Sequence, residues 1–287
     1  MLIKEMINNY LSYVKRQFEY GTFKFYRNHL GHFERWINNL GYYRVGELPE
    51  NIFDDYIFDM KKTCSNLTIN KRIGIIKRMF RKSDVGFPNL FKIEKFKERR
   101  KTFDMLSREQ LKRINNYMDS LDPRVNNNLM YNCLIRLLTE TGARINEILN
   151  IKKRNVKIYD DYGTILLTKT KNNTDRTVLF SYSSIELIEK TINDSDSEYL
   201  LFNKLRNRRA AYCDVRYLMG MLKEKLNIDK LHPHMFRHSM ATIWLENGAD
   251  LKSVMTILGH SNIETTNRYL HQNPKHITKL YVDKFKI

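Results

Sequence analysis

Two histidines, an arginine and a tyrosine lie close together near the end of the sequence, at spacings typical of helix ends and short turns. His234 and Arg237 are three residues apart, His260 follows a glycine, and Tyr269 comes nine residues after His260. A phenol with a pKa of about 10 is a poor nucleophile at neutral pH. Beside cationic donors and a base, however, Tyr269 could lose its proton as it attacks. These residue types therefore predict chemistry that breaks and rejoins a DNA phosphodiester.

Two arginines could neutralise the phosphate in such a reaction. Arg144 and Arg237 would each bind a non-bridging oxygen, and His260 would donate a hydrogen bond to the same group. Glu147 lies three residues after Arg144 on the same helix face and would hold its guanidinium. His234 shares a face with Arg237 and could accept or return a proton. The ordinary alternatives are a surface ion pair, two polar residues at a helix start, and a histidine that caps a helix or lies in the core.

A lysine is the expected proton donor for the leaving deoxyribose oxygen. Lys169 and Lys171 lie in a polar turn between two expected strands, and either could reach over the cleavage point. The alternative for each lysine is simple contact with a DNA groove. Carboxylate pairs and histidine clusters at metal-ligand spacing are missing from the sequence, and two guanidiniums with a histidine can neutralise the phosphate without magnesium. We therefore expect no metal.

The periodicity of apolar residues predicts a mainly α protein with a small antiparallel β-sheet, of the α+β class. Ser107 with Gln110, and Ser261 with Glu264, form capping boxes at helix starts. Gly142 and Gly259 should end helices, since glycine tolerates the left-handed conformation. Strands are expected at about 156–158, 164–168 and 177–180. Helices are expected at about 2–14, 33–40, 52–60, 68–80, from 107, 128–140, just after 142, 184–192, 214–226, 235–247, 250–258 and from 261.

The charge balance indicates a polyanionic partner. The chain has 50 Lys and Arg against 32 Asp and Glu, a formal charge of +18. Residues 71–101 hold twelve basic residues against three acidic ones, a net of +9. The alternative is an ordinary solvated face on a generically basic protein. We expect nucleic-acid contact from the basic face of the helix at 68–80 and the residues that follow it: Lys71, Arg72, Lys77, Arg78, Arg81 and Lys82.

Two domains are expected, separated by a charged segment of weak periodicity. The linker is placed at 92–105, between a helical domain at 1–91 and a mixed domain at 106–287. The three cysteines are widely spaced and lack a C-x-x-C pair, which suits a reducing cytosol and a cytoplasmic protein. Lys4 and Glu5 interrupt the start before any signal peptide could form, and no apolar run approaches the ~20 residues of a membrane span.

Four motifs together resemble the tyrosine recombinase (phage integrase) family in order and spacing. They are TGARINEIL at 141–149, HMFRH at 234–238, LGHS at 258–261 and TNRYLH at 266–271. The resemblance implies that Arg144 and Arg237 are the paired arginines and that His234 and His260 are the two histidine positions. Tyr269 would be the nucleophile that forms a 3′-phosphotyrosine bond.

The same resemblance bears on the choice of lysine. The segment KNNTDR at 171–176 aligns with the family pattern Lys-x-Asn-x-Glu-Arg, which favours Lys171 as the catalytic lysine and leaves Lys169 as a DNA contact. Lys169-Thr170 also matches a Lys-Thr form of the family, so both lysines stay open. No energy cofactor is implied, because the phosphotyrosine bond keeps the free energy of the phosphodiester.

The resemblance further implies a two-domain clamp around double-stranded DNA that carries a specific recombination site. Residues 1–91 would be the core-binding domain, and 106–287 the catalytic domain with a C-terminal tail helix. Four copies would assemble on paired sites and exchange strands through a Holliday junction, whereas the free protein would be a monomer or weak dimer. The tail would dock on a neighbouring subunit or fold back on its own domain. The competing functions are an inactive DNA-binding relative and a type IB topoisomerase.

Overall fold

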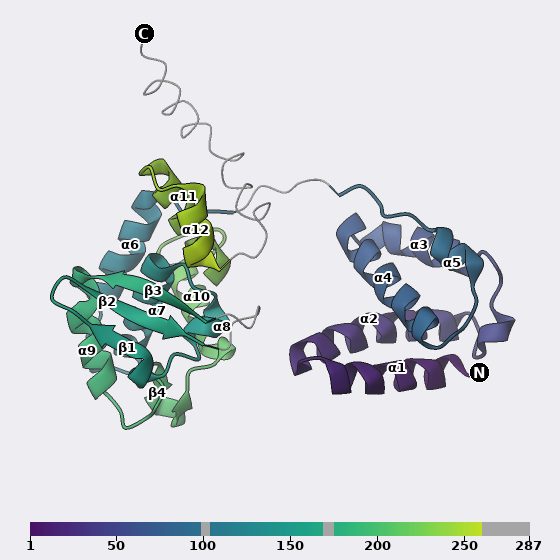
Figure 1. Cartoon of the computed structure of the whole chain (residues 1–287), viewed down its shortest axis with the longest axis horizontal. Coiled ribbons are helices and arrows are strands. Elements are labelled where there is room, and N and C mark those ends of the chain that lie inside the picture. The colour runs from purple at the N-terminus through teal and green to yellow at the C-terminus, as the bar shows by residue number, and fades with distance from the viewer. Residues whose placement is uncertain (99–103, 169–174, 260–287) are drawn as a thin grey trace, which may run out of the picture. The chain divides into compact units, whose positions relative to one another are not determined.

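The computed structural model describes residues 1–98, 104–168 and 175–259 (Figure 1). The chain divides into two compact units, Met1–Lys101 and Thr102–Ile287. The division falls inside the segment where the linker is expected. No helix within the described ranges combines the length and the apolar character that crossing a membrane requires.

The first unit consists of helices packed around α4. Amphipathic periodicity accounts for its helices: in α1 the buried side chains Ile3, Met6, Tyr10 and Val14 recur at helical spacing. Helix α4 packs against α1, α2 and α3. Helix α2 begins well before the predicted stretch at 33–40. The short α5, with a proline in its first turn, was not predicted. The elements are α1 (Ile3–Gln17), α2 (Tyr20–Asn39), η1 (Val45–Glu47), α3 (Ile52–Thr63), α4 (Asn66–Lys82) and α5 (Pro88–Lys92).

Residues 93–98 are attached to the first unit although they form no helix or strand. The Asn70 side chain of α4 donates to the Phe96 carbonyl at 2.9 Å and accepts from the Phe96 amide at 2.9 Å. The Asn66 side chain donates to the Lys97 carbonyl at 2.8 Å. Phe96 also packs against the apolar core of this unit. The first part of the expected linker is therefore bound along α4.

The second unit surrounds helix α7, most of whose residues are buried, as its apolar sequence predicts. The helices expected near 184–192, 214–226, 235–247 and 250–258 are confirmed. Its elements are α6 (Arg108–Asp119), α7 (Asn128–Thr141), α8 (Ile145–Ile148), η2 (Lys153–Asn155), β1 (Val156–Ile158), β2 (Tyr162–Leu167), β3 (Arg176–Ser181), η3 (Tyr182–Ser184), α9 (Ile185–Asn193), β4 (Phe202–Asn203), η4 (Lys204–Arg206), β5 (Arg208–Arg209), α10 (Tyr212–Lys225), α11 (Pro233–Glu246) and α12 (Leu251–Leu258).

The expected antiparallel sheet is confirmed, in the order β1-β2-β3. Alternate residues of β2 and β3 are buried, so one face packs inward and β3 contacts α7. Gly163 pairs with Phe180, and a Cβ at Gly163 would lie 1.9 Å from the Phe180 ring. A glycine is needed there for space. The small hairpin of β4 and β5 was not predicted, because strands of two residues carry too little periodicity.

The predicted helix boundaries follow from local chemistry. Ser107 accepts from the Gln110 amide at 3.1 Å, and the Gln110 side chain accepts from the Ser107 amide at 2.9 Å, which confirms the capping box. Gly142 and Gly259 adopt positive φ values of 59° and 64° at the ends of α7 and α12. Ser261 and its capping box lie outside the described residues.

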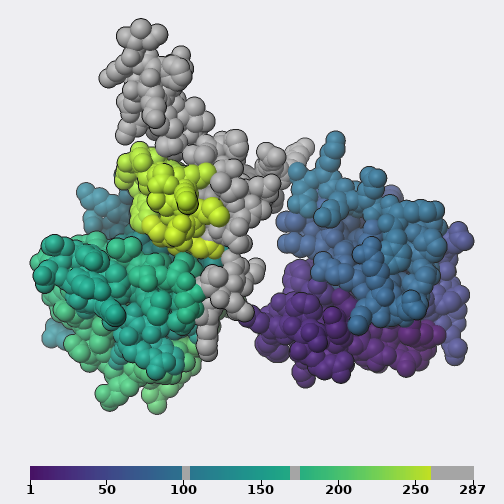
Figure 2. Space-filling model, viewed as in Figure 1, coloured from purple at the N-terminus to yellow at the C-terminus, as the bar shows by residue number. Residues whose placement is uncertain are grey.

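Helix α12 closes the described part of the second unit. It packs against α11 and β3, and its other side is exposed at the surface. In Figure 2 the yellow-green atoms of α11 and α12 form one region of that surface. A small apolar cluster of Met240, Leu245, Val254 and Leu258 joins α11 to α12. This cluster lies against Gly142, where an added Cβ would be 1.8 Å from Met240 Cε. The two glycine-ended helices therefore meet at one place.

Replacing Gly142 by alanine should destabilise the second unit by about 2 kcal/mol, because the methyl group clashes with Met240 and the φ value is positive. Gly220, exposed in α10 with open space around its Cα, is the matched control, and Gly220→Ala should stabilise by about 0.5–1 kcal/mol. The chain has two tryptophans, Trp36 in α2 and Trp244 in α11. Urea unfolding in a Trp36→Phe background therefore reports on the second unit. Equal effects at both glycines would contradict the packing described.

Candidate active site

Arg144 is held at the start of a single helical turn. It is the residue before α8, and its amide donates to Glu147 Oε2 at 2.8 Å. Its guanidinium donates to Glu147 Oε1 at 2.9 Å and to the Gly259 carbonyl at 3.3 Å. The Arg144 side chain remains 23% exposed, so part of it reaches solvent. The expected pairing of Arg144 with Glu147 is present in the structure.

Glu147 is a buried carboxylate shared by two arginines. Besides Arg144, it accepts two hydrogen bonds from Arg176, at 3.0 and 2.7 Å. Burial alone would raise the pKa of Glu147, but the hydrogen bonds from Arg176 and Arg144 outweigh burial and hold this pKa below its ordinary value. Glu147 therefore stays negatively charged at neutral pH and offsets part of the positive charge around it.

Arg237 lies on α11 and is almost fully buried, with 4% of its surface exposed. Its guanidinium donates to the Gly142 carbonyl at 2.6 Å and to the Leu258 carbonyl at 2.7 Å. These are carbonyls at the ends of α7 and α12, where a helix leaves its last carbonyls without partners of its own. The two glycine-ended helices thus orient Arg237.

Three successive carbonyls at the end of α12 bind three different arginines. Ile257 accepts from Arg176 Nε at 2.9 Å, Leu258 from Arg237, and Gly259 from Arg144. The negative end of the helix dipole favours cations at this position. Among the described residues that these bonds join, three guanidiniums meet one carboxylate, a net charge of +2. Such a cluster can bind a phosphate and stabilise the charge that develops on it.

Two histidines accompany Arg237 on α11. The ring centroid of His234 lies 6.3 Å from that of His238 and 6.5 Å from that of His232. Desolvation by the surrounding chain, followed by electrostatic interaction with Arg237, His232 and Arg144, lowers the pKa of His234. His234 is therefore neutral at pH 7 and able to accept a proton. Burial lowers the pKa of His238 to about 4.

Four predicted site residues lie outside the described residues: Lys169, Lys171, His260 and Tyr269. Their roles therefore stay predictions from the sequence. The described parts of the chain next to them are Gly259, which precedes His260, and strands β2 and β3, which come before and after the two lysines in the sequence.

The six basic residues predicted to contact nucleic acid differ in their surroundings. Lys77 Nζ donates to the carbonyls of Phe91 and Ile93, at 3.4 and 2.5 Å, and so holds the end of α5. Arg72, half-buried, donates to Cys64 Sγ at 3.6 Å. The four others are exposed, although three of them also contact aromatic side chains of the first unit: Lys71, Arg78, Arg81 and Lys82. Exposure makes these four the stronger candidates for phosphate contact.

Sequence reasoning missed the part that Arg176 plays in the arginine cluster. In the sequence, Arg176 stands out only as the last residue of the KNNTDR segment at 171–176, whose alignment favours Lys171. The available signal was its type: an arginine at the first position of a strand, beside a hairpin, can reach a carboxylate on a neighbouring element. Its partner Glu147 is 29 residues away, so local spacing could not reveal the pair.

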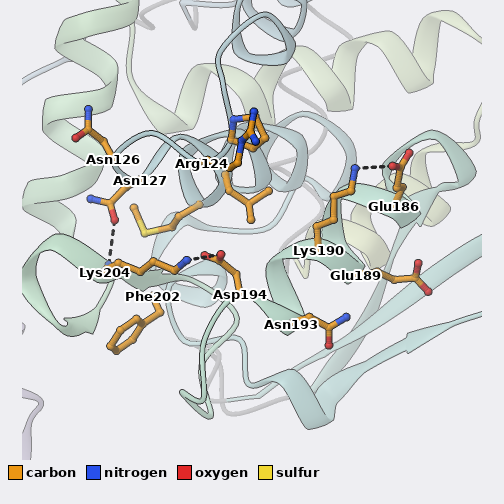
Figure 3. Close-up of a pocket in the computed structure, with 13 residues that line it drawn as sticks. Arg124, Asn126, Asn127, Glu186, Glu189, Lys190, Asn193, Asp194, Phe202 and Lys204 are labelled. Carbon is orange, nitrogen blue, oxygen red and sulfur yellow. Dashed lines mark hydrogen bonds and ion pairs between the residues drawn. The ribbon is translucent and has the colours of Figure 1, made fainter.

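A surface cavity of about 730 Å³ lies elsewhere on the second unit, among α7, α9 and β4 (Figure 3). Its lysines are already paired: Lys204 with Asp194, and Lys190 with Glu186 at 2.5 Å. None of the residues that line the cavity belongs to the arginine cluster. With its cations neutralised by acidic neighbours, this cavity is not suited to a phosphate.

Comparison with known proteins matches residues 104–276 to the phage integrase family. A probable integrase/recombinase of Acholeplasma phage L2 is 27% identical over 98% of this chain and 97% of its own length. Tyrosine recombinase XerC of Staphylococcus aureus is 25% identical, with coverage of 98% and 95%.

Two solved structures share the fold. One is the XerH site-specific recombinase bound to palindromic difH substrate in a post-cleavage complex. It has a TM-score of 0.76 at 19% identity, over 90% of this chain and 78% of that one. The other is a lambda integrase dimer bound to a COC′ core site, with a TM-score of 0.76 at 13% identity and coverage of 96% and 97%.

Acid should destabilise the second unit through His238. Its pKa of about 4 in the folded protein lies below the ordinary value of 6.5, so between these values the unfolded chain binds more protons. Stability from this residue is therefore complete above pH 6.5 and falls progressively towards pH 4. From pH 7 to pH 5 we expect a loss of about 1 kcal/mol, less than the full linkage value because the ring is half-buried.

Urea unfolding of the Trp36→Phe protein at pH 7, 6 and 5 measures this loss, and adding His238→Gln should reduce it. An equal pH dependence with and without His238 would contradict the assignment.

Proposed function

This chain belongs to the phage integrase family, and from that premise we propose that it is a tyrosine recombinase that cuts and rejoins double-stranded DNA at a specific site. The observation that supports the proposal most directly is the convergence of Arg144 and Arg237 on adjacent carbonyls, those of Gly259 and Leu258. Two guanidiniums held that close together suit the two non-bridging oxygens of one phosphate.

In the proposed reaction, the Tyr269 oxygen attacks phosphorus and the bond from phosphorus to the 5′ oxygen breaks. The phenol loses its proton as it attacks, with the neutral His234 as the base. Lys171, or Lys169 in the alternative assignment, gives a proton to the leaving 5′ oxygen. Arg144, Arg237 and His260 stabilise the negative charge on the pentacoordinate phosphate.

Rejoining reverses these steps with a different 5′ hydroxyl as the nucleophile. That hydroxyl attacks the 3′-phosphotyrosine, and the bond between phosphorus and the tyrosine oxygen breaks. One phosphate ester is exchanged for another at each step, so the proposed cycle needs no energy cofactor. With four copies on paired sites, two rounds of exchange would pass through a Holliday junction.

The two units have separate parts in this proposal. Residues 1–91 act as the core-binding domain, whose exposed cations on α4 contact the DNA backbone. Residues 106–287 carry the chemistry, with 92–105 as the linker between them. Support for a DNA partner comes from the charge of +18 and from the two related recombinases whose structures contain their DNA sites.

A covalent adduct tests the proposal. A binding site is first selected from random duplexes, and a nicked duplex with that site is then incubated with the protein. The short strand released beside the nick diffuses away, so the cut cannot be rejoined. We expect a protein–DNA adduct that resists detergent, abolished by Tyr269→Phe because no phenol oxygen remains.

Tyr182→Phe, at an exposed tyrosine on η3, is the matched control and should form the adduct normally. An adduct that persists in Tyr269→Phe would remove that residue from the mechanism. Selective binding without any adduct from the unaltered protein would identify an inactive DNA-binding relative instead.

Binding should weaken steeply with salt, because each phosphate that the protein neutralises contributes a log–log slope of about −0.9. Changing Lys71, Arg78 and Lys82 together to glutamine removes three such contacts and should therefore reduce the slope by about 3. The control Lys190→Gln removes a lysine already paired with Glu186, and should leave the slope nearly unchanged. Fluorescence anisotropy from low to moderate salt provides the measurement. Equal slopes for the triple variant and the unaltered protein would refute the proposed role of α4.

A further inference from the structure

We propose that Arg176 is a positioning residue that keeps the charge of Arg144 available to the scissile phosphate. The inference rests on the proposed function, because it concerns the same site. Arg176 begins β3, and in the sequence it shortly follows Lys169 and Lys171. It therefore links strand β3 to the arginine cluster.

Three hydrogen bonds hold the Arg176 guanidinium in place. Its Nη1 and Nη2 atoms donate to the two oxygens of Glu147, at 3.0 and 2.7 Å, and its Nε donates to the Ile257 carbonyl at 2.9 Å. The Arg176 side chain is 11% exposed and that of Glu147 is 3% exposed. One guanidinium thus connects β3, α8 and α12, all within the well-packed second unit.

The end of α12 is fitted closely around this side chain. A Cβ on Gly259 would lie 2.9 Å from Arg176 Nη1 and 3.0 Å from its Cζ. Glycine is therefore required at 259 both for its φ of 64° and for room beside Arg176. Because Gly259 also supplies the carbonyl that accepts from Arg144, Arg176 supports Arg144 from two sides.

The charge balance around Glu147 explains how Arg176 would affect the reaction. Glu147 accepts four hydrogen bonds, two from Arg144 and two from Arg176. If Arg176 were lost, a buried carboxylate would have Arg144 as its remaining guanidinium partner in this group and would attract it more strongly. Glu147 would then compete with the DNA phosphate for Arg144. Arg176 prevents this competition by sharing the carboxylate.

Lysine cannot replace arginine in this arrangement. Three hydrogen bonds in one plane, to two carboxylate oxygens and a carbonyl, match the fork of a guanidinium. A lysine keeps the positive charge, yet its single ammonium cannot reach all three acceptors. Arg176→Lys therefore tests geometry with the charge conserved.

The test measures single-turnover cleavage of the nicked duplex selected as described above, at saturating protein, and binding separately by anisotropy. Arg176→Lys should slow cleavage on the order of 10²-fold, the loss typical of a small misplacement. DNA affinity should change no more than about 3-fold, since the other phosphate contacts remain.

The decisive comparison is made in an Arg144→Ala background over long incubations. If Arg176 acts through Arg144, Arg176→Lys should cause no further loss there. Multiplicative losses in the double variant would overturn the inference. Glu147→Gln removes the carboxylate that Arg176 shares with Arg144. In the Arg144→Ala background it should likewise cause no further loss of cleavage rate. This second cycle keeps the test decisive if Arg176→Lys does not fold.

Arg208 provides a matched control for loosened packing. It holds the buried Asp214 with two hydrogen bonds, at 2.8 and 3.1 Å, in the β4–β5 region. Arg208→Lys should lower the melting temperature much as Arg176→Lys does, but leave the cleavage rate within about 2-fold, since neither residue of the ion pair that it weakens belongs to the cluster. Equal slowing by both variants would show a structural role only and overturn the inference. Absence of cleavage by the unaltered protein would instead refute the proposed function.

Discussion

The last turn of α12 is the structural element on which the arginine cluster depends. The carbonyls of its last two residues, Ile257 and Leu258, and of Gly259 at its C-cap each accept a hydrogen bond from a different arginine, and these arginines come from three distant parts of the sequence. A helix leaves these carbonyls without partners of its own and carries a partial negative charge at this end. The fold uses that end to gather cations that would otherwise repel one another.

Bringing three guanidiniums together has an electrostatic cost, which the surrounding chain offsets unevenly. Glu147 neutralises one charge by pairing with Arg144 and Arg176, and the carbonyl dipoles of Gly142 and Leu258 accept hydrogen bonds from Arg237. Among the described residues that these bonds join, the net charge of +2 suits a phosphate diester that carries one negative charge and gains more as the nucleophile adds. The cluster is thus prepared for the proposed reaction before DNA binds, and little reorganisation is needed at the moment of reaction.

The connection between the units is anchored at both of its described ends. Asn70 binds the backbone of Phe96 on the first unit, and the amide of Leu106 donates to Ser239 Oγ at 2.6 Å on the second. Ser239 is on α11, two residues after Arg237. The first described residues of the second unit are therefore hydrogen-bonded to the same helix that carries one arginine of the cluster.

Sequence alone determined the features that depend on short-range periodicity or on residue type. These include nearly all the helices of the second unit, its three-stranded sheet, the helix ends at Gly142 and Gly259, and the pairing of Arg144 with Glu147. Each is decided by residues within one or two turns of each other, so the pattern is readable locally. The family resemblance likewise rests on residue types in order, and the comparison confirmed it.

Only the tertiary structure decided what meets at the cluster. Arg176 reaches Glu147 across 29 residues and Ile257 across 81, and no local spacing encodes either contact. The same holds for Lys77, whose type and helical face suggested a phosphate contact but whose ammonium binds the carbonyls at the end of α5. An arginine or lysine side chain has several donors and a long reach. Which acceptor it binds is therefore set by how the elements pack, because packing fixes the acceptors that lie within reach and away from competing water.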